Sequence, residues 1–321
     1  YNRNINLDVE RIGGYRNFIN KIWNAYRFIQ PHLELAQNEL PKDLDDQEKW
    51  VLSELNQTAK VMNESVEEYR FDDSCSALYS FIYDSFCSWF IELSKPTLNG
   101  DNEELRAKRA TVLKYCFRDI VKLLHPFAPF ITEELWTELK AQDEDLLIVQ
   151  DYPEFNESMV YTKEQENMNK FIEIVTSTRF LRQSVNIKPK EEVTLNLFTD
   201  ESDLQEFLKA NIGGIKELAK AKEVHIASKN ENRPEKAIMK ATTHTEVFLP
   251  LEGVIDLSEQ VKRLENDLKK TQKEFEKYDK KISNERFLAN AKPEVVEEVK
   301  ANHSELKEKI ESIEDRIKAF K

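Results

Sequence analysis

Apolar residues recur at every third or fourth position through most of residues 14–139. This spacing places them on one side of an α-helix. Two prolines between His125 and Phe130 interrupt the pattern, because proline lacks a backbone N–H and restricts the residue before it. Helices are therefore predicted at residues 14–29, 47–69, 72–93, 102–124 and 132–139. Together they indicate a helical bundle that ends near residue 155.

The segment at 72–93 differs from its neighbours because apolar residues surround nearly its whole circumference. Such a helix is buried on several sides, so it is predicted to be the central element of the bundle. Asp72 or Asp73 is expected to cap its start. Lys95 and Pro96 follow its expected end.

The pattern changes character after Pro153. Residues 193–197 alternate apolar and polar side chains with a period of two, which is typical of a strand. Further strands are expected at 224–227 and 247–251, and helices at 165–182 and 203–211, with Gly213 and Gly214 in a turn. These short alternating elements indicate a small α/β module.

The C-terminal segment carries the most regular pattern of the chain. From Leu257 to Ile282, and again from Val296 to Phe320, apolar residues alternate in steps of four and three, which is the a/d seam of a coiled coil. Pro293 stands where a first-turn proline is tolerated. Each helix of about 27 residues would be roughly 40 Å long. Equal lengths around one short loop predict an antiparallel hairpin.

The predicted fold class is therefore mainly α, in three parts. An anticipated helical bundle covers residues 1–155, a small α/β linker module covers 156–256, and a coiled-coil arm covers 257–321. Charged residues make up 33% of the chain, whereas only 6 glycines and 10 prolines interrupt it, which favours long charged helices. A chain of 321 residues is also long enough for several domains.

The formal net charge of −13 argues at first against a nucleic-acid partner, because phosphate affinity comes from clustered Lys and Arg. The acidity is unevenly distributed, however. Residues 257–321 contain 16 basic and 15 acidic side chains, and the far end of the hairpin, residues 269–292, contains eight basic and four acidic ones. A long hairpin with basic side chains at its far end is suited to reaching a distant phosphate surface. A solvated coiled coil or a dimerisation zipper is the simpler alternative for this pattern taken alone.

The first helix carries a second candidate surface. Asn17, Lys21, Asn24 and Phe28 fall at steps of four, three and four, with Arg27 beside them, opposite much of the apolar stripe. Cations, amides and an aromatic ring on one face offer phosphate neutralisation, hydrogen bonds to base edges and base stacking, as an unpaired RNA loop requires. Periodicity alone also permits the simpler interpretation that Phe28 packs on a neighbouring helix and the cations are ordinary surface charges.

The residues give little support to chemistry other than binding. Cys75, Cys87 and Cys116 lack the paired spacing of a zinc site and are expected to be buried, reduced thiols. The histidines are scattered, so no metal is expected, and the sequence contains no Gly-rich phosphate cradle, nucleophile elbow or HExxH motif. Trp23 and Trp136 are expected to anchor the core. No apolar run is long enough to span a bilayer, so no membrane association is expected.

Long sequence motifs add what periodicity does not provide. One spans residues 15–28 and includes Asn20–Ala25, and another spans residues 122–136 and includes His125–Phe127. Parts of residues 69–92 match the third helix of the same domain. Together these stretches resemble the anticodon-binding domain of the class I valine, isoleucine and leucine tRNA ligases.

The C-terminal hairpin distinguishes among these three families. Residues 249–257, which lead into the first seam, and residues 281–287, at its tip, are similar to the tRNA arm of bacterial valine enzymes. The other two families lack this arm. The resemblance covers nearly the whole chain, which is thus identified as a C-terminal part of a member of the bacterial valine-tRNA ligase family.

The resemblance implies two tRNA-binding surfaces. The helical domain of the family receives the anticodon, and the arm supports the outer corner of the tRNA. The anticodon-side residues are Lys21, Asn24, Arg27 and Phe28, and the arm residues are Lys277, Lys280, Lys281 and Arg286.

The resemblance also implies what the chain lacks. The family attaches valine to tRNA(Val) with ATP and Mg, using HIGH-type and KMSKS-type motifs that hold ATP, and neither motif occurs in this sequence. No catalytic residue and no cofactor are therefore expected in the chain. The expected partners are tRNA(Val) and the catalytic portion of the same polypeptide, in a cytoplasmic monomer. The alternative is a helical coiled-coil module for protein interaction or dimerisation, without RNA binding.

Overall fold

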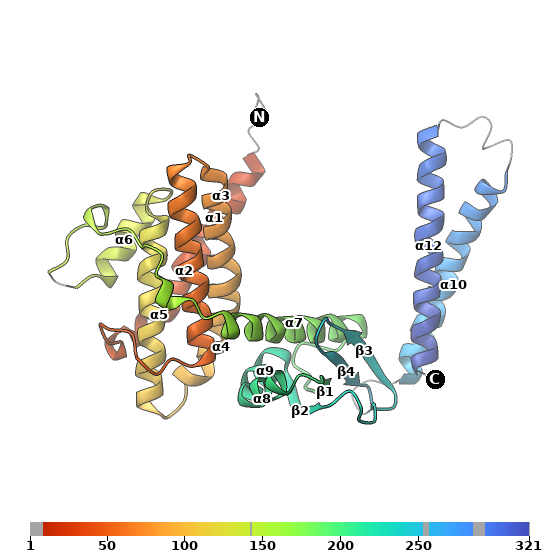
Figure 1. Ribbon diagram of the computed structural model, residues 1–321. Coiled ribbons are helices and arrows are strands. Elements are labelled where there is room, and N and C mark those ends of the chain that lie inside the picture. The colour runs from red at the N-terminus through yellow and green to blue at the C-terminus, as the bar shows by residue number, and fades with distance from the viewer. Residues whose placement is uncertain (1–8, 142, 253–256, 285–292, 321) are drawn as a thin grey trace. The chain divides into compact units, whose positions relative to one another are not determined.

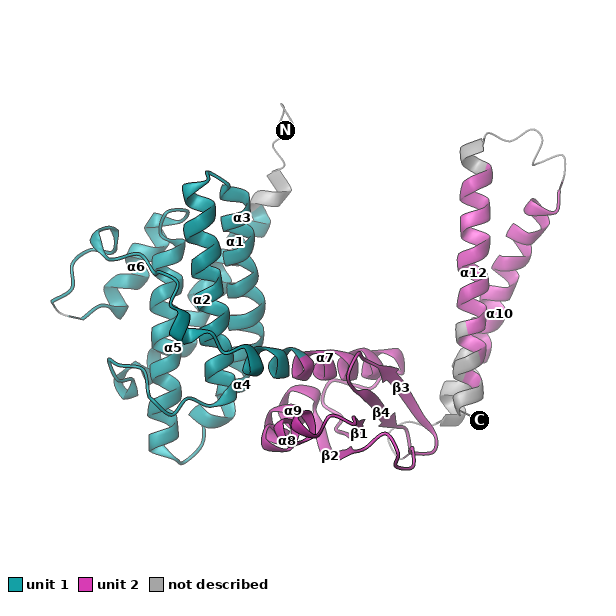
Figure 2. Ribbon diagram, in the orientation of Figure 1, with its two compact units in different colours: residues 1–169 teal, residues 170–321 magenta. Residues whose placement is uncertain are grey.

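The computed structural model describes residues 9–141, 143–252, 257–284 and 293–320. It separates into two compact units, residues 1–169 and 170–321 (Figure 1, Figure 2). The described chain is mainly α-helical with one four-stranded sheet, which confirms the predicted fold class. None of the described helices combines the length and the apolar character that crossing a membrane requires.

The first unit is a helical bundle, and the helices predicted for it are confirmed with small shifts of their ends. Its elements are α1 (Val9–Ile29), η1 (Gln30–Leu35), α2 (Asp46–Glu67), α3 (Phe71–Ser80), η2 (Phe81–Phe90), α4 (Ile91–Leu98), α5 (Glu103–Leu124), α6 (Pro129–Leu139), η3 (Leu147–Val149) and η4 (Glu157–Met159). Helix α7 (Thr162–Ser184) begins in this unit and continues into the second. The largest buried side chains include Trp50, Phe86, Phe117 and Trp136.

Helix α2 begins with a capping box that also ties it to α5. The Asp45 side chain accepts a hydrogen bond from the Glu48 N–H, and the Glu48 carboxylate accepts one from the Asp45 N–H. Arg109 of α5 pairs with both carboxylates, at 2.7 Å from Asp45 and 3.1 Å from Glu48. Because Arg109 and Glu48 are only 2% and 1% exposed, this ion pair is shielded from water and fixes α5 against α2.

The elements α3, η2 and α4 follow one another without a gap and form one continuous helical rod, where the sequence predicts a helix at 72–93. Two details of that prediction are wrong. Arg70 stands at the N-cap in place of an aspartate, and no side chain makes the capping hydrogen bond; Arg70 pairs with Asp73 instead. The rod also continues through Pro96 to Leu98. Burial of Leu98 in the bundle compensates for the backbone hydrogen bond that proline removes.

The second unit contains the four-stranded sheet, with strand order β2-β1-β4-β3. Its elements are β1 (Val193–Phe198), α8 (Ser202–Ala210), α9 (Ile212–Ala219), β2 (Ala221–Ala227), β3 (Ala237–Ala241) and β4 (Glu246–Pro250). Strand β1 is parallel to β2 and antiparallel to β4, and β4 is antiparallel to β3. The alternating residues Val193, Leu195 and Leu197 are fully buried, as a half-buried strand pattern predicts.

Two elements of this unit differ from the prediction. Gly213 and Gly214 lie inside α9 and not in a turn, because burial of Ile215 and Leu218 outweighs the low helix propensity of glycine. Strand β3 has no counterpart in the prediction. It is an edge strand whose side chains are half-buried or exposed, Met239 among them, so no clear alternation marks it in the sequence.

Helices α10 (Leu257–Ile282) and α12 (Pro293–Phe320) pack against each other as the predicted hairpin (Figure 1). Thr271 of α10 and Val299 of α12 are buried along the seam. The rings of Phe275 and His303 stack across it, with 4.5 Å between their centroids. The division of the chain into three parts, with boundaries at residues 155 and 256, stays a prediction.

Two of the three cysteines are buried and one is exposed. Burial raises the pKa of the Cys87 thiol to about 11 and that of Cys116 well above its ordinary value, so both thiols are protonated at neutral pH. The prediction of burial is wrong for Cys75. Helix α3 buries only Ser74 and Leu78, and Cys75 lies on its exposed side.

Candidate nucleic-acid interface

Helix α1 presents the polar face that the sequence predicts. The side chains of Asn17, Asn24 and Arg27 are exposed, whereas those of Lys21 and Phe28 are half-buried. Within the described part of the chain, no hydrogen bond or ion pair engages Asn24 or Arg27. Both side chains are therefore free to meet a ligand.

Lys21 is already engaged inside the bundle. Its Nζ donates hydrogen bonds to the Tyr83 carbonyl oxygen at 3.1 Å and to Ser88 Oγ at 3.2 Å. The same nitrogen lies 3.2 Å from the centroid of the Tyr83 ring. Because Tyr83 and Ser88 belong to the π-helical element η2, Lys21 connects α1 to η2, and its charge is less available to solvent than that of Arg27.

Phe28 lies near two basic side chains that sequence reasoning did not single out. The centroid of its ring is 5.8 Å from that of His32 and 5.9 Å from Nζ of Lys95. Lys95 reaches this position because α4 continues past the expected end of the rod. Burial lowers the pKa of His32, so its imidazole is neutral at pH 7. We refer to Arg27, Phe28, His32 and Lys95 as the Phe28 cluster.

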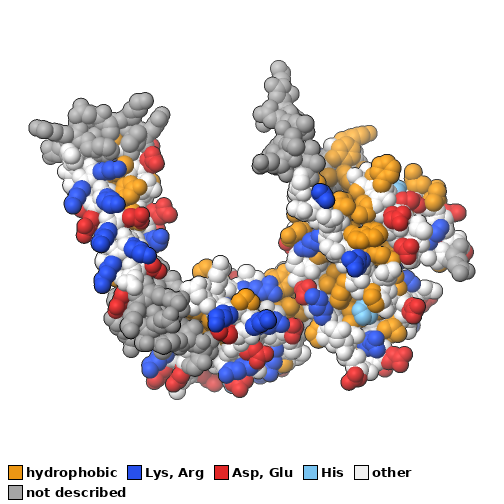
Figure 3. All heavy atoms as spheres, turned by 180° about the vertical axis from the view of Figure 1, so that it is seen from behind, with side chains coloured by type: hydrophobic (Ala, Val, Ile, Leu, Met, Phe, Trp, Pro, Cys, Tyr) orange, Lys and Arg blue, Asp and Glu red, His pale blue; other side chains and the backbone are white. Residues whose placement is uncertain are grey.

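A row of aromatic rings joins α1 to α3 and η2. The rings of Phe18 and Tyr79 stack at 4.8 Å, and those of Tyr79 and Tyr83 stack at 5.4 Å and within 6° of parallel. Tyr79 and Tyr83 remain 44% and 39% exposed. Hydrophobic side chains gather on the face of the helical unit seen in Figure 3. The sequence gives no sign of these exposed rings, because residues 72–93 are apolar nearly all round.

The hairpin places basic side chains near the end of α10. Lys277, Lys280 and Lys281 are exposed, and Lys and Arg side chains line the described part of the arm in Figure 3. Residues 269–284 contain six lysines and three acidic residues. One of those acidic residues, Asp279, pairs with His303 at 3.1 Å. The fourth predicted arm residue, Arg286, lies outside the described residues.

The two tryptophans expected in the core differ. Trp136 is fully buried, and its indole N–H donates a hydrogen bond of 3.0 Å to the Asp145 carbonyl oxygen, as expected of a core anchor. Trp23 contradicts the prediction in part, because it is 37% exposed. The centroid of its ring lies 5.7 Å from that of Tyr26.

Two family models match the chain. Residues 48–197 match the anticodon-binding domain of tRNA ligases, and residues 256–321 match the valyl tRNA synthetase tRNA-binding arm. The two matched segments contain the larger part of the helical bundle and the whole described hairpin.

Similar proteins agree with these matches. The valine–tRNA ligase of Enterococcus faecalis is 35% identical over 318 residues, which cover 98% of this chain and 36% of that protein. The valine–tRNA ligases of Staphylococcus saprophyticus and Listeria innocua are each 34% identical, over 99% of this chain and 36% of theirs. The chain therefore belongs to the valine–tRNA ligase family and corresponds in it to the anticodon-binding domain and the tRNA-binding arm.

Proposed function

We propose that this chain recognises tRNA(Val) through two surfaces, the Phe28 cluster for the anticodon loop and the end of α10 for the outer corner of the tRNA. One observation carries the proposal: Arg27 at the first surface and Lys277, Lys280 and Lys281 at the second are exposed, and no described acidic residue pairs with them. The alternative, a dimerisation module, needs only the coiled coil. It does not account for the cations and amides on α1.

The Phe28 cluster has the parts that an unpaired loop requires. The Phe28 ring offers a face for one base, and base stacking on an aromatic ring contributes about 1–3 kcal/mol. Arg27 can neutralise a phosphate beside that base, and Lys95, which pairs with Glu92 at 2.6 Å, adds a second cation nearby. Asn24 lies one helical turn before Phe28, so its amide can meet a base edge. The neutral imidazole of His32 adds a second surface for stacking.

The arm surface requires charge more than shape. Lys277, Lys280 and Lys281 are exposed on the last turns of α10, where flexible ammonium groups can follow a phosphate backbone without base contacts. Such contacts release counterions, so this part of the affinity should fall steeply with salt. The hairpin thus adds affinity, and the Phe28 cluster adds selection among tRNAs.

Electrophoretic mobility shifts with tRNA(Val) and an unrelated tRNA, each at two salt concentrations, test the proposal. We expect salt-sensitive binding of both RNAs and tighter binding of tRNA(Val). Equal affinity for the two tRNAs would contradict the selection of tRNA(Val), and no binding at low salt would favour the protein-interaction alternative.

Aminoacylation itself we assign to the catalytic portion that the longer relatives contain, which uses ATP and Mg to attach valine. The sequence contains neither the HIGH-type nor the KMSKS-type motif that holds ATP in the family. We therefore expect this chain alone to give only background ATP–pyrophosphate exchange and no hydrolysis of mischarged tRNA. Exchange above background would contradict this assignment.

We further propose that the chain is monomeric in the cytoplasm, where it meets the tRNA pool. The apolar seam of α10 is covered by α12 of the same chain, so the coiled coil needs no second copy. Sedimentation equilibrium should give a mass near 37.8 kDa at micromolar concentration. A dimer mass would favour the dimerisation alternative.

A further inference from the structure

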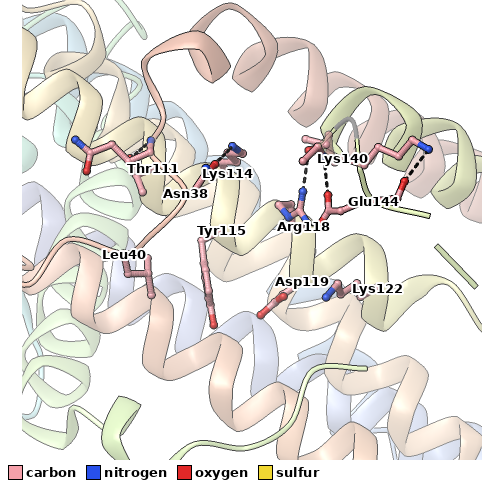
Figure 4. A pocket seen from close by; sticks show the side chains of 13 residues that line it. Asn38, Leu40, Thr111, Lys114, Tyr115, Arg118, Asp119, Lys122, Lys140 and Glu144 are labelled. Atoms are coloured by element: carbon pink, nitrogen blue, oxygen red, sulfur yellow. Dashed lines mark hydrogen bonds and ion pairs between the residues drawn. The ribbon is translucent and has the colours of Figure 1, made fainter. Parts of the chain in front are cut away.

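A pocket of about 490 Å³ lies in the helical unit beside α5, and its lining includes none of the residues assigned to tRNA above (Figure 4). Lys114, Arg118 and Lys122 stand on successive turns of α5 and share this side of the helix. Lys140, which follows α6, adds a fourth cation. The lining thus gathers four basic side chains against two acidic ones, Asp119 and Glu144, in a chain whose net charge is −13.

Two of these cations are held in place by the protein. Arg118 donates a hydrogen bond of 2.8 Å to the Leu139 carbonyl oxygen and pairs with the Glu144 carboxylate. It also lies with its guanidinium carbon 4.4 Å from the centroid of the Trp136 ring. Lys140 donates a hydrogen bond of 3.1 Å to the Glu144 carbonyl oxygen. Arg118, Lys140 and Glu144 therefore form a fixed rim.

The other two cations form no close ion pair within the described chain, although the carboxyls of Asp119 and Glu144 belong to the same lining. Lys114 has one long contact, 3.5 Å from its Nζ to Asn38 Oδ1, and burial together with Arg118 lowers its pKa. Lys122 has its Nζ 5.7 Å from the centroid of the Trp136 ring. Among the described residues neither lysine forms an ion pair. Two ammonium groups in one concave site therefore have donors available for an added anion.

The remaining lining favours a compact anion with several acceptor oxygens. The amides of Gln37 and Asn38 add polar groups around the same space, whereas the hydroxyl of Tyr115 is hydrogen-bonded to Asp119. Tyr115 is the only aromatic ring among the lining residues, so a nucleobase would find no sandwich of rings in which to stack. A phosphate group matches both the charge and the number of donors.

We propose that this pocket binds a phosphate group, either of a small phosphate ion or of an RNA backbone. Lys114 and Lys122 supply the charge, and the fixed rim of Arg118, Lys140 and Glu144 borders the same space. The proposal does not depend on the tRNA surfaces of α1 and α10, because none of its residues belongs to them.

The test is a calorimetric titration of the 321-residue chain with inorganic phosphate and then pyrophosphate, at an ionic strength held constant with chloride. Lys114→Gln combined with Lys122→Gln should weaken binding at least tenfold. Lys216→Gln combined with Lys222→Gln removes the same charge from exposed positions of the sheet unit and is the matched control. The control should bind as the parent chain does.

A second set of titrations, with tRNA, distinguishes the two sources of phosphate, a free ion and an RNA backbone. If the pocket variant loses the small anions but keeps its tRNA affinity, the site serves a free phosphate. If the small anions do not bind and the pocket variant loses tRNA affinity beyond the control, the site serves RNA. The proposal is overturned if the pocket variant and the control behave alike with all three probes. Circular dichroism checks that the double variant is folded. If it is not, the test is repeated with Lys140→Gln, which lies outside the helices.

Discussion

Arg27 and Phe28 are neighbours in sequence but stand in different surroundings. Arg27 is exposed and has no partner among the described residues, so removal of its charge should leave the fold intact. Phe28 is half-buried and lies within about 6 Å of His32 and Lys95. Under the proposed function, Arg27 serves ligand contact alone, whereas Phe28 lies on a surface that is also part of the bundle.

Substitutions at these two positions should separate binding from stability. Arg27→Gln is expected to weaken tRNA(Val) binding with no change in melting temperature. Phe28→Leu should weaken binding by about 1–3 kcal/mol, the contribution of one stacked base. Fluorescence anisotropy with labelled tRNA measures both effects, with Lys222→Gln as the control. Affinities within twofold of the parent for both variants would contradict the anticodon assignment.

Asp119 provides a test at the residue scale that needs no RNA. Its carboxyl is half-buried, and this burial raises its pKa to about 6 in spite of the nearby Lys122 and Arg118 and a hydrogen bond with Tyr115. The pKa in the unfolded chain is about 3.9. The folded state thus holds this proton more tightly, so its contribution to stability is fully present below about pH 4 and is lost as the pH rises through about 6.

Asp119→Asn should remove this dependence, because an amide does not ionise. Chemical denaturation at pH 4, 5, 6 and 7.5 should show the variant gaining stability relative to the parent as the pH rises. A difference that stays constant across this range would mean that the carboxyl is not perturbed.

The residues of the candidate site were only partly predictable from the sequence. The polar face of α1 follows from helical spacing, and the sequence motif places Arg27 and Phe28 in it. The proximity of Lys95 and His32 to Phe28 could not be predicted, because it depends on how far α4 continues and on the short helix η1 that follows α1. The engagement of Lys21 by η2 depends in the same way on packing between helices.

At the scale of elements, helices and strands with a clear apolar period are confirmed, long and short alike, whereas those without one were missed. The regular spacing of apolar residues in the sequence of α10 predicts both ends of the helix correctly, because many residues define the same period. Strand β3 and helix α9 are short. Strand β3 forms by pairing with β4, and α9 forms by packing against the sheet. The π-helical element η2 has no sequence signal, since its residues have the same apolar character as an ordinary buried helix.

The buried pair between α2 and α5 gives a prediction at this scale. Arg109→Leu removes the cation 3.1 Å from the buried Glu48 carboxylate and leaves Lys108, at 3.8 Å, as its remaining described cation, which should cost about 3–5 kcal/mol of unfolding free energy. Glu92→Gln breaks the more exposed pair with Lys95 and should cost no more than about 1 kcal/mol. Urea denaturation compares the two. Similar costs would mean that the Arg109 pair does not fix α5 against α2.

At the scale of the whole molecule, the uneven charge decides how an acidic chain can bind RNA. The acidic excess lies before residue 257, and the basic excess lies at residues 269–292. Repulsion between the acidic remainder and RNA is screened beyond about 10 Å at 0.1 M salt. The lysines at the end of α10 then act locally on the phosphates that they contact.

Neutralising these lysines should change the salt dependence of tRNA binding. Lys277→Gln, Lys280→Gln and Lys281→Gln together should lower the slope of log affinity against log salt by about 0.7–0.9 for each phosphate that the variant no longer neutralises. The triple variant Lys190→Gln, Lys216→Gln and Lys222→Gln removes the same charge from exposed positions of the sheet unit. Equal slopes for the two triple variants would show that total charge and not the arm controls binding.

The most direct test of two separate tRNA surfaces is hydroxyl-radical footprinting on tRNA(Val). The parent chain should protect the anticodon loop and the outer corner of the tRNA. Arg27→Gln combined with Phe28→Leu should lose only the anticodon protection, and the α10 triple variant should lose only the protection of the outer corner. Loss of both footprints in either variant, or protection confined to other parts of the tRNA, would contradict the two-surface account.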